Sequence, residues 1–405
     1  MRSISCRSAA LAAAAACALA CALHAPTAEA QQPLALRVGY GVTWDDNVFR
    51  LPDNAPDPQL SRGISGKSDR FSTAFVGLSL DKPYSLQRIL LDVTKTAIRY
   101  DKFSSRDQDP LNYRGAWQWQ VTPRITGALN ASRSETAVNI EDVAGRRSID
   151  QTMTTLAATA DATVSGAWHL LGGVSETKTT YSEPFLAQPD TTQTTAEAGL
   201  RYAASSTSQV SVTRRQGRGT ETFSDPAITG GSDFTVDETE VSATWVASAR
   251  STLNARATYI ERSHDLLPQR DFSGTNGALS YAWQPTGRLS VNLSAVRTIS
   301  PFNLSLQSTT RTEETLSLGL AWQLRERIAV QPRVVRRESR FGQVSTSPDP
   351  TRRDISTVLD VGATWTPRRY ATLTARLMHE QRDSTDATQT FEATTASVNL
   401  AFTFQ

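Results

Sequence analysis

Cysteine is scarce in this chain, and its placement narrows the chemistry. Of 405 residues three are cysteines, and all of them lie in the alanine-rich segment that opens the sequence: Cys6, Cys17 and Cys21. That segment ends at Ala28-Glu29-Ala30, a small-residue pattern typical of an export-signal cleavage site. We expect residues 1–30 to be a signal peptide, with acylation at Cys21 as the less favoured alternative. From residue 31 on, the chain has no thiol for a disulfide framework, a zinc-thiolate site or a cysteine nucleophile.

Long hydrophobic runs are also missing. Beyond residue 30 no run approaches the roughly 18 apolar residues that a membrane-spanning helix needs, which excludes a helical membrane protein. The formal charge is +2, 39% of the residues are hydrophobic and the mean hydropathy is -0.36. A β-barrel shares such averages with soluble proteins, because its strands turn only alternate residues toward lipid. No linker rich in proline or glycine divides the chain, so we expect residues 31–405 to form a single outer-membrane β-barrel domain.

What the chain has instead is strict alternation. In residues 354–365 one set of alternate positions is mostly apolar and includes Leu359, Val361 and Trp365, while the other set includes Asp354 and Asp360. Residues 371–380 repeat the split after the short break at 366–369. Side chains alternate across a strand, so this pattern predicts a two-stranded hairpin with one apolar and one polar face.

One such unit recurs along the sequence, with an aromatic residue just before each short turn. The marker aromatics are Trp119, Tyr202, Trp245, Trp283, Trp322 and Trp365. From Tyr202 onward they lie about 40 residues apart, a period that a propeller or a helical solenoid also produces. A propeller blade holds about four short strands, whereas each unit here holds two strands of ~11 to 14 residues. That length lets a tilted strand cross a bilayer.

We predict eighteen strands, joined alternately by short turns and longer polar loops. Their expected ranges are 34–44, 69–80, 87–100, 111–121, 125–135, 151–164, 167–181, 192–203, 207–218, 234–247, 251–262, 272–284, 288–300, 311–323, 327–340, 354–365, 370–382 and 391–404.

Together these features predict an all-β fold, a transmembrane antiparallel up-and-down β-barrel of about 18 strands with periplasmic N- and C-termini. Its place would be the outer membrane of a Gram-negative cell, with outer-membrane lipid around it. A soluble β-sandwich is the alternative, and the length and regular spacing of the strands disfavour it. Residues 391–404 resemble the C-terminal signal that the barrel assembly machinery recognises, although the chain ends on Gln405 rather than on the aromatic residue.

In such a barrel the polar face of each strand lines the lumen. The residues that we expect to line a substrate path are Arg201, Arg215, Arg256, Arg311, Arg333, Arg337, Asp360, Arg376 and Glu380. Further inward carboxylates are Glu197, Glu238, Glu240 and Glu313. Because the two signs nearly balance, the lining should hydrate a pore without strongly selecting anions or cations.

Signals for other chemistry are weak. The histidines after residue 30, His169, His264 and His379, have no recognisable catalytic partner motif, so we expect no enzyme activity. Residues 51–58 carry carboxylates, but their spacing does not fit a calcium loop, and we expect no metal and no cofactor. No phosphate-binding loop or nucleic-acid motif is present, so nucleic acid is not an expected partner.

One segment carries a family resemblance. The stretch GYGVTWDDNVFRL, residues 39–51, contains Asp45, Asp46, Asn47, Phe49, Arg50 and Leu51. It resembles the N-terminal signature of the EpsL family of outer-membrane barrels, which are associated with exosortase and exopolysaccharide loci. From the residues alone, Asp45, Asp46 and Asn47 also suit a strand-ending turn in which short polar side chains bond nearby backbone.

The resemblance implies a passive channel that exports an extracellular polysaccharide together with periplasmic export components. A barrel of 16 to 18 strands leaves an aqueous channel wide enough for such a role to be considered. Two alternatives remain open from the sequence, namely a general diffusion porin and a structural barrel whose lumen is closed by arginine–glutamate pairs.

Overall fold

The computed structural model describes most of the chain. The described residues are 33–56, 66–138, 148–182, 189–223, 232–301, 308–343 and 352–405. The signal peptide expected at 1–30 lies outside them, as do parts of several long loops, including the end of the 51–58 segment. No helix within these ranges is long and apolar enough to span a membrane.

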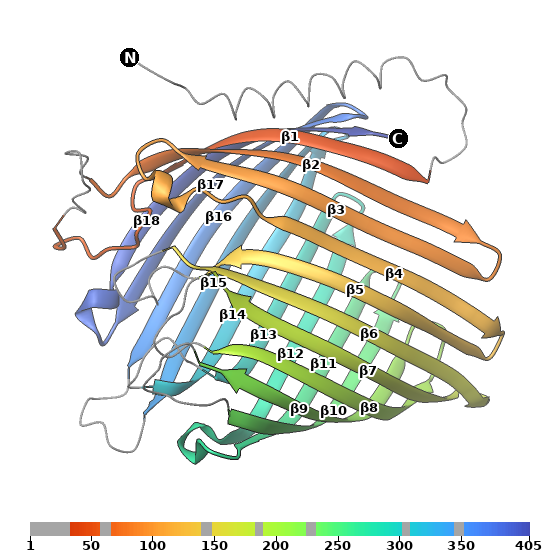
Figure 1. The fold of residues 1–405 in the computed structure, drawn as a ribbon. Helices are drawn as coiled ribbons and strands as arrows, with labels where there is room; N and C mark the ends of the chain where they lie inside the picture. Colours follow the sequence, from red (N-terminus) through yellow and green to blue (C-terminus); the bar gives the residue numbers. More distant parts are fainter. Residues whose placement is uncertain are drawn as a thin grey trace.

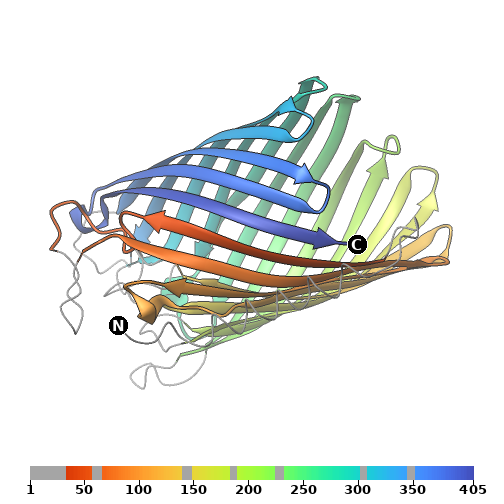
Figure 2. The same cartoon turned by 90° about the horizontal axis from the view of Figure 1, so that it is seen from above.

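Eighteen antiparallel strands form one closed sheet, which confirms the predicted fold class. Each strand pairs with its neighbours in the chain, and the first and last strands pair with each other to close the barrel, as the adjacent red β1 and dark blue β18 show in Figures 1 and 2. The strands are β1 (Leu34–Asp45), β2 (Asp69–Tyr84), β3 (Gln87–Tyr100), β4 (Leu111–Thr122), β5 (Ile125–Ala137), β6 (Asp150–Ser165), β7 (Trp168–Tyr181), β8 (Asp190–Ala203), β9 (Gln209–Thr222), β10 (Ser232–Ser248), β11 (Ser251–His264), β12 (Phe272–Thr286), β13 (Leu289–Pro301), β14 (Ser308–Arg325), β15 (Ile328–Gln343), β16 (Arg353–Arg368), β17 (Ala371–Ser384) and β18 (Phe391–Phe404).

The two ends of the barrel differ. At one end, here called the short-turn end, consecutive strands are joined by brief turns such as residues 123–124 and 369–370. The opposite, long-loop end has longer connections, and its described residues form three short 3-10 helices, η1 (Ser104–Arg106), η4 (Pro268–Arg270) and η5 (Ala387–Gln389). Leu36 pairs with Phe404, so the start of β1 and the end of β18 both lie at the short-turn end.

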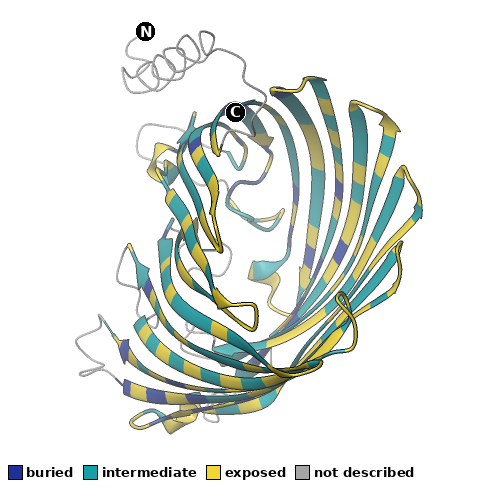
Figure 3. Cartoon of the chain, turned by 90° about the vertical axis from the view of Figure 1, so that its right-hand side faces the viewer, coloured by how far each residue is buried: buried dark blue, intermediate teal, exposed yellow. Residues whose placement is uncertain are grey.

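The two faces of the wall separate the residue types as the alternation predicts. Exposed and covered residues alternate along the strands in Figure 3. On β16 the side chains of Leu359, Val361 and Trp365 are about half exposed, whereas Asp354 and Asp360 are buried. Side chains spread apart on the outside of a cylinder and crowd together inside it. The apolar face is therefore the outer face, and the polar face is the inner wall.

Aromatic side chains ring the outer face near the short-turn end. Among the marker residues, Trp245, Trp322 and Trp365 are each about half exposed. Trp168 and Tyr202 lie side by side on neighbouring strands, with ring centroids 5.0 Å apart. This is the arrangement of an aromatic girdle at a membrane interface.

Candidate functional site

The inner wall carries charges that are largely matched in pairs. Arg376 on β17 donates from Nε to Oδ1 of Asp360 on β16 at 2.6 Å, and its Nη2 donates to the second carboxylate oxygen. Nε of Arg337 on β15 lies 3.3 Å from Oε1 of Glu313 on β14. The sequence placed these four residues on one face, and the barrel brings them together as two ion pairs.

A glutamate cluster surrounds Arg215 on the opposite part of the wall. The guanidinium donates to Glu197 on β8 at 2.9 Å and to Glu240 on β10 at 3.0 Å. Glu238 lies 3.5 Å from the same guanidinium. One arginine thus contacts three glutamates, and Arg256 on β11 places a second guanidinium near Glu240.

Arg201 belongs to a third group, close to the short-turn end. Its Nη2 donates to the carboxylate of Asp161 on β6, and His169 on β7 lies 2.8 Å from that same carboxylate. Asp161 was not among the residues predicted to line the lumen. The alternation of the strand does place Asp161 at a polar position. However, its neighbours Ala160 and Ala162 have side chains too small to show which face of the strand is apolar.

The remaining predicted lining residues differ in how they are paired. Arg256 on β11 and Arg333 on β15 are both exposed and make no hydrogen bond within the described part of the chain, and Arg256 interacts electrostatically with Glu240. Arg311 on β14 is half buried. Glu380 on β17 forms an ion pair of 3.7 Å with Arg50 and thus belongs to a different cluster.

The charges are distributed unevenly around the wall. In the middle of the wall, strands β8 to β10 carry Arg215 against Glu197, Glu238 and Glu240, with Arg256 on the adjacent β11. Strands β14 to β17 carry Arg333, Arg337 and Arg376 against Asp360 and Glu313, with Arg311 nearer the long-loop end of β14. Six strands, β10 to β15, lie between β9 and β16 in the eighteen-stranded sheet, so the two patches lie on different parts of the wall of the bore. Both patches lie away from the strand ends, in the middle of the wall.

Another group of charges lies at the long-loop end and was not predicted. Glu221 on β9 has 1% of its surface exposed and accepts from Arg262 on β11 at 2.6 Å and from Arg270 in η4 at 2.7 Å. The Arg262 guanidinium lies 3.7 Å from the ring centroid of Phe234. Burial lowers the pKa of Arg270, and the Glu221 carboxylate opposes that effect. These contacts hold η4 against the inner wall. The sequence hid them because they join residues 41 to 49 positions apart.

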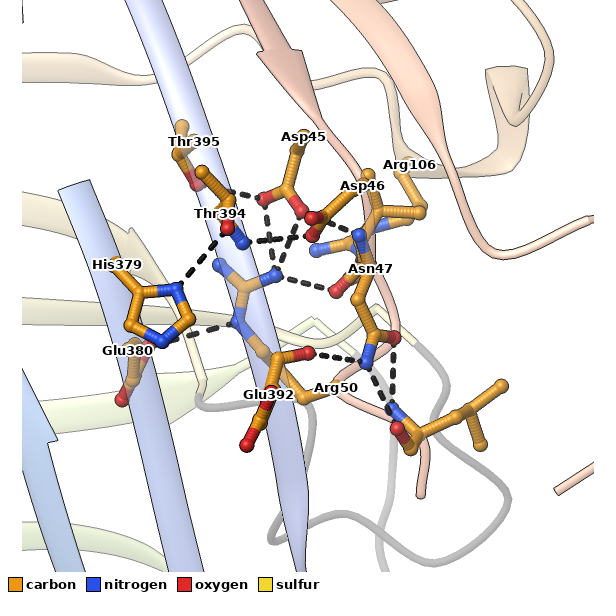
Figure 4. A network of polar contacts seen from close by, with 12 residues as sticks. Asp45, Asp46, Asn47, Arg50, Arg106, His379, Glu380, Glu392, Thr394 and Thr395 are labelled. Carbon is orange, nitrogen blue, oxygen red and sulfur yellow. Dashed lines mark hydrogen bonds and ion pairs between the residues drawn. The ribbon is translucent and has the colours of Figure 1, made fainter. Parts of the chain in front are cut away.

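The residues of the EpsL-like segment occupy the seam between the first and last strands (Figure 4). Asp45 is 7% exposed. Its carboxylate accepts a hydrogen bond from the backbone amide of Asn47 at 2.9 Å and two from Nη1 of Arg50, each at 2.9 Å. Asn47 donates from Nδ2 to the carbonyl oxygens of Leu51 at 2.8 Å and Glu392 at 2.9 Å. The strand-ending turn predicted from the residues is therefore present, and it is also bonded to β18.

Two further contacts complete this seam cluster. Oδ1 of Asp46 accepts from the backbone amide of Thr394 at 2.7 Å. Phe49 packs edge-on against Phe103, whose side chain is fully buried, with ring centroids 4.7 Å apart. Arg50 adopts φ of 53°, a left-handed conformation that costs free energy for a non-glycine residue and is held here by its ion pairs. The motif residues thus connect β1 to β17, β18 and the β3–β4 loop.

The closed antiparallel barrel, its apolar outer face with an aromatic girdle and its charged inner wall define a protein with the architecture of outer-membrane porins. In particular, the fold is similar to the crystal structure of Pseudomonas aeruginosa OpdK with vanillate, at a TM-score of 0.50 and 10% identity, covering 91% of this chain and 98% of that one. A second OpdK structure from the same organism gives a TM-score of 0.50, 9% identity and coverage of 91% and 99%. P. aeruginosa OccK2 (OpdF) in complex with glucuronate follows at a TM-score of 0.49, 9% identity and coverage of 92% and 96%.

Comparison with protein families and with curated proteins finds no match. The resemblance of residues 39–51 to the EpsL family thus has no support beyond the motif itself. Across the described residues, no group of three side chains suited to hold a metal ion occurs.

Proposed function

We propose that this protein is an outer-membrane porin, a passive diffusion channel for small polar solutes. The observation that carries the proposal is the mid-wall arrangement of charges inside a closed eighteen-stranded barrel, with excess carboxylates on β8 to β10 and an excess guanidinium on β14 to β17. Barrels of 16 to 18 strands leave an aqueous interior, and ionised side chains need water there.

The pairing of the charges bears on selectivity. Most inner guanidinium groups are neutralised by a carboxylate within hydrogen-bond reach, so long-range attraction of one ion sign is weak. A wall richer in carboxylates at β8 to β10 and richer in guanidinium groups at β14 to β17 instead favours solutes that carry a dipole or both signs of charge. Arg333 supplies an exposed guanidinium group that has no partner within the described part of the wall and is suited to transient contact with carboxylates.

Polysaccharide export, which the EpsL resemblance implies, would use the same bore, but the fold comparisons favour the porin. Deletion of the gene distinguishes the two functions in the cell. For an exporter, deletion of the gene should abolish surface glycan while its synthesis continues. For a porin, surface glycan should be unchanged and uptake of small solutes should fall.

The direct test is conductance of the purified full chain in planar lipid bilayers. We expect stepwise insertion, steady ohmic current in potassium chloride and a permeability ratio of potassium to chloride near one. A barrel that inserts without current would be a structural barrel with a closed lumen, and the porin proposal would then be wrong.

A further inference from the structure

The outer face of the barrel contains a groove that the channel function does not use. It runs across β10 to β15 and has a volume of about 650 Å³. Its floor is made of small residues on the outer face, Ala243, Ala255, Ala257, Gly277 and Ala295. Val241, Leu279 and Leu316 stand beside this floor and are each about half exposed. The groove is therefore an apolar depression in the surface that faces lipid.

Charged residues lie at one end of this groove. Arg297, Glu314, Arg336 and Glu338 belong to its lining. Ion pairs extend the group on the outer face, because Arg340 lies 2.6 Å and Arg353 2.9 Å from Oε1 of Glu338. We call these six residues the rim network.

The rim network is basic. Its four guanidinium groups face two carboxylates, which leaves two positive charges in excess. Arg336 is exposed and has no hydrogen bond or ion pair to any described residue. Guanidinium groups match phosphate oxygens in pairs of parallel hydrogen bonds, so the excess charge suits a phosphate headgroup.

The height of the rim network fits a lipid headgroup. Trp322 lies in the girdle at the short-turn end, and Glu314 lies eight residues away on the same face of β14. Eight residues span about 26 Å of strand at roughly 3.3 Å each. With a strand tilt of about 35 to 45° this corresponds to about 20 Å along the barrel axis. The apolar band of such barrels is about 25 Å tall, so the network lies at the far interface, toward the long loops.

We propose that this groove binds a phosphorylated saccharolipid of the outer leaflet, with an acyl chain along the small-residue floor and a phosphate on Arg336 and its neighbours. The inference rests on the proposed outer-membrane location, which puts the long-loop end in the outer leaflet. The occupant is chosen because that leaflet is built from phosphate-bearing lipid A, and because the headgroup must bring negative charge to a network with two uncompensated guanidinium groups.

A second groove of the outer face provides an internal control. It has a volume of about 730 Å³ and is lined on the opposite part of the barrel by residues that include Gly115, Trp117, Leu129, Ala131, Leu156 and Glu176. Its lining contains Glu176 and no arginine or lysine. The two grooves are alike in size and apolar character and differ in charge, so the proposal predicts tight lipid binding at the first alone.

Both grooves contain a glycine that accepts a side chain. A Cβ on Gly277 would approach its nearest heavy atom at 3.7 Å, and a Cβ on Gly115 at 3.8 Å, both ordinary contacts. Gly277→Leu therefore fills the first groove and Gly115→Leu fills the second without strain on the wall. Arg336→Glu reverses the charge of a residue without a described partner, and Lys178→Glu on the outer face of β7 is its matched control.

The test is native mass spectrometry of the purified full chain titrated with diphosphoryl lipid A, dephosphorylated lipid A or phosphatidylglycerol. We expect one diphosphoryl lipid A per barrel, with its Kd raised about tenfold by Arg336→Glu and by Gly277→Leu. Lys178→Glu and Gly115→Leu should leave it unchanged, and the other two lipids should bind at least about tenfold more weakly.

Equal binding by Arg336→Glu and Lys178→Glu would overturn the proposal, and so would equal binding of phosphatidylglycerol. Current measured in planar bilayers tests the proposed channel function independently of lipid binding. Wild-type protein that conducts without binding lipid A refutes the lipid site alone. Protein that binds lipid A with the expected variant pattern but carries no current refutes the porin alone.

Discussion

Arg50 and Asp45 form a nearly enclosed ion pair at the seam of the barrel, with Nη1 of the arginine 2.9 Å from both carboxylate oxygens. The side chains are only 15% and 8% exposed. Neither charge has enough water around it to be stable alone, so Asp45 depends on Arg50, which is itself paired with both Asp45 and Glu380.

Arg50→Ala should therefore lower the free energy of unfolding by about 3 kcal/mol, because it leaves the Asp45 carboxylate buried without its guanidinium partner. The matched control is Arg70→Ala, which breaks the exposed pair of Arg70 with Asp101 and should cost less than about 1 kcal/mol. Urea unfolding of the refolded barrel in detergent, followed by tryptophan fluorescence, measures both. Equal losses for the two variants would mean that the seam pair has no special role.

Asn47→Ala removes the amide that bonds to the carbonyl oxygens of Leu51 and Glu392 and the oxygen that accepts from the Leu51 amide. We expect a loss of about 1 to 3 kcal/mol, since partly buried backbone groups lose their partners. Asn47→Asp keeps the acceptor but places a buried carboxylate oxygen against the two carbonyl oxygens, so its loss should be at least as large as that of Asn47→Ala. The same unfolding measurement checks the order of the three proteins, and an Asn47→Asp protein as stable as the wild type would show that the bond across the seam contributes little.

Arg333→Glu should shift the channel toward cations, because it reverses an unpaired guanidinium on the inner wall beside Asp360. We expect the permeability ratio of potassium to chloride to rise by about two- to fivefold at low salt, and the shift to shrink at 1 M salt as screening increases. Arg214→Glu changes the same charge on the outer face of β9, where Arg214 pairs with Asp237, and serves as the control. Reversal potentials in a salt gradient give the ratio. An equal shift for both variants would place Arg333 outside the conducting path.

Gly127→Ala should destabilise the barrel by about 1 to 3 kcal/mol through overpacking. A Cβ at Gly127 would approach the Thr159 carbonyl oxygen and the Trp119 ring to 2.3 Å each. Gly115→Ala on the neighbouring strand has room at 3.8 Å and should be neutral or slightly stabilising. The difference between the two in thermal unfolding midpoint tests whether this glycine is required by the girdle tryptophan.

The sequence predicted much of the barrel because the alternation is local. The expected ranges 87–100 and 391–404 coincide with β3 and β18, and every other strand overlaps its expected range. Several strands extend further than expected, as β2 does through Pro83 to Tyr84. Proline and charged residues interrupt the apolar pattern there, but the strand continues because its partner β3 supplies the ladder of hydrogen bonds.

The candidate site was less accessible to sequence reasoning. Alternation along the strand is enough to predict that the side chains of Arg215 and Arg376 point into the barrel. Their ion-pair partners lie on neighbouring strands, and which residues become partners depends on the register between the strands. The contact of Asn47 with Glu392 spans 345 residues and exists only after the sheet has closed. A short motif such as residues 45–51 therefore carries no sign of its distant partner, and its bonding role at the seam emerges only from the folded barrel.

Pairing of β1 with β18 has a consequence for biogenesis. β1 cannot complete its hydrogen bonds until the fourteen residues of β18 have paired with it. A chain that ends before Phe391 would leave the edges of β1 and β17 unpaired in the membrane. Each edge would then expose a row of backbone amide and carbonyl groups without hydrogen-bond partners to the lipid acyl chains. The hydrogen bonds of β18 to β1 and to β17 are therefore what turns the sheet into a closed cylinder without free strand edges.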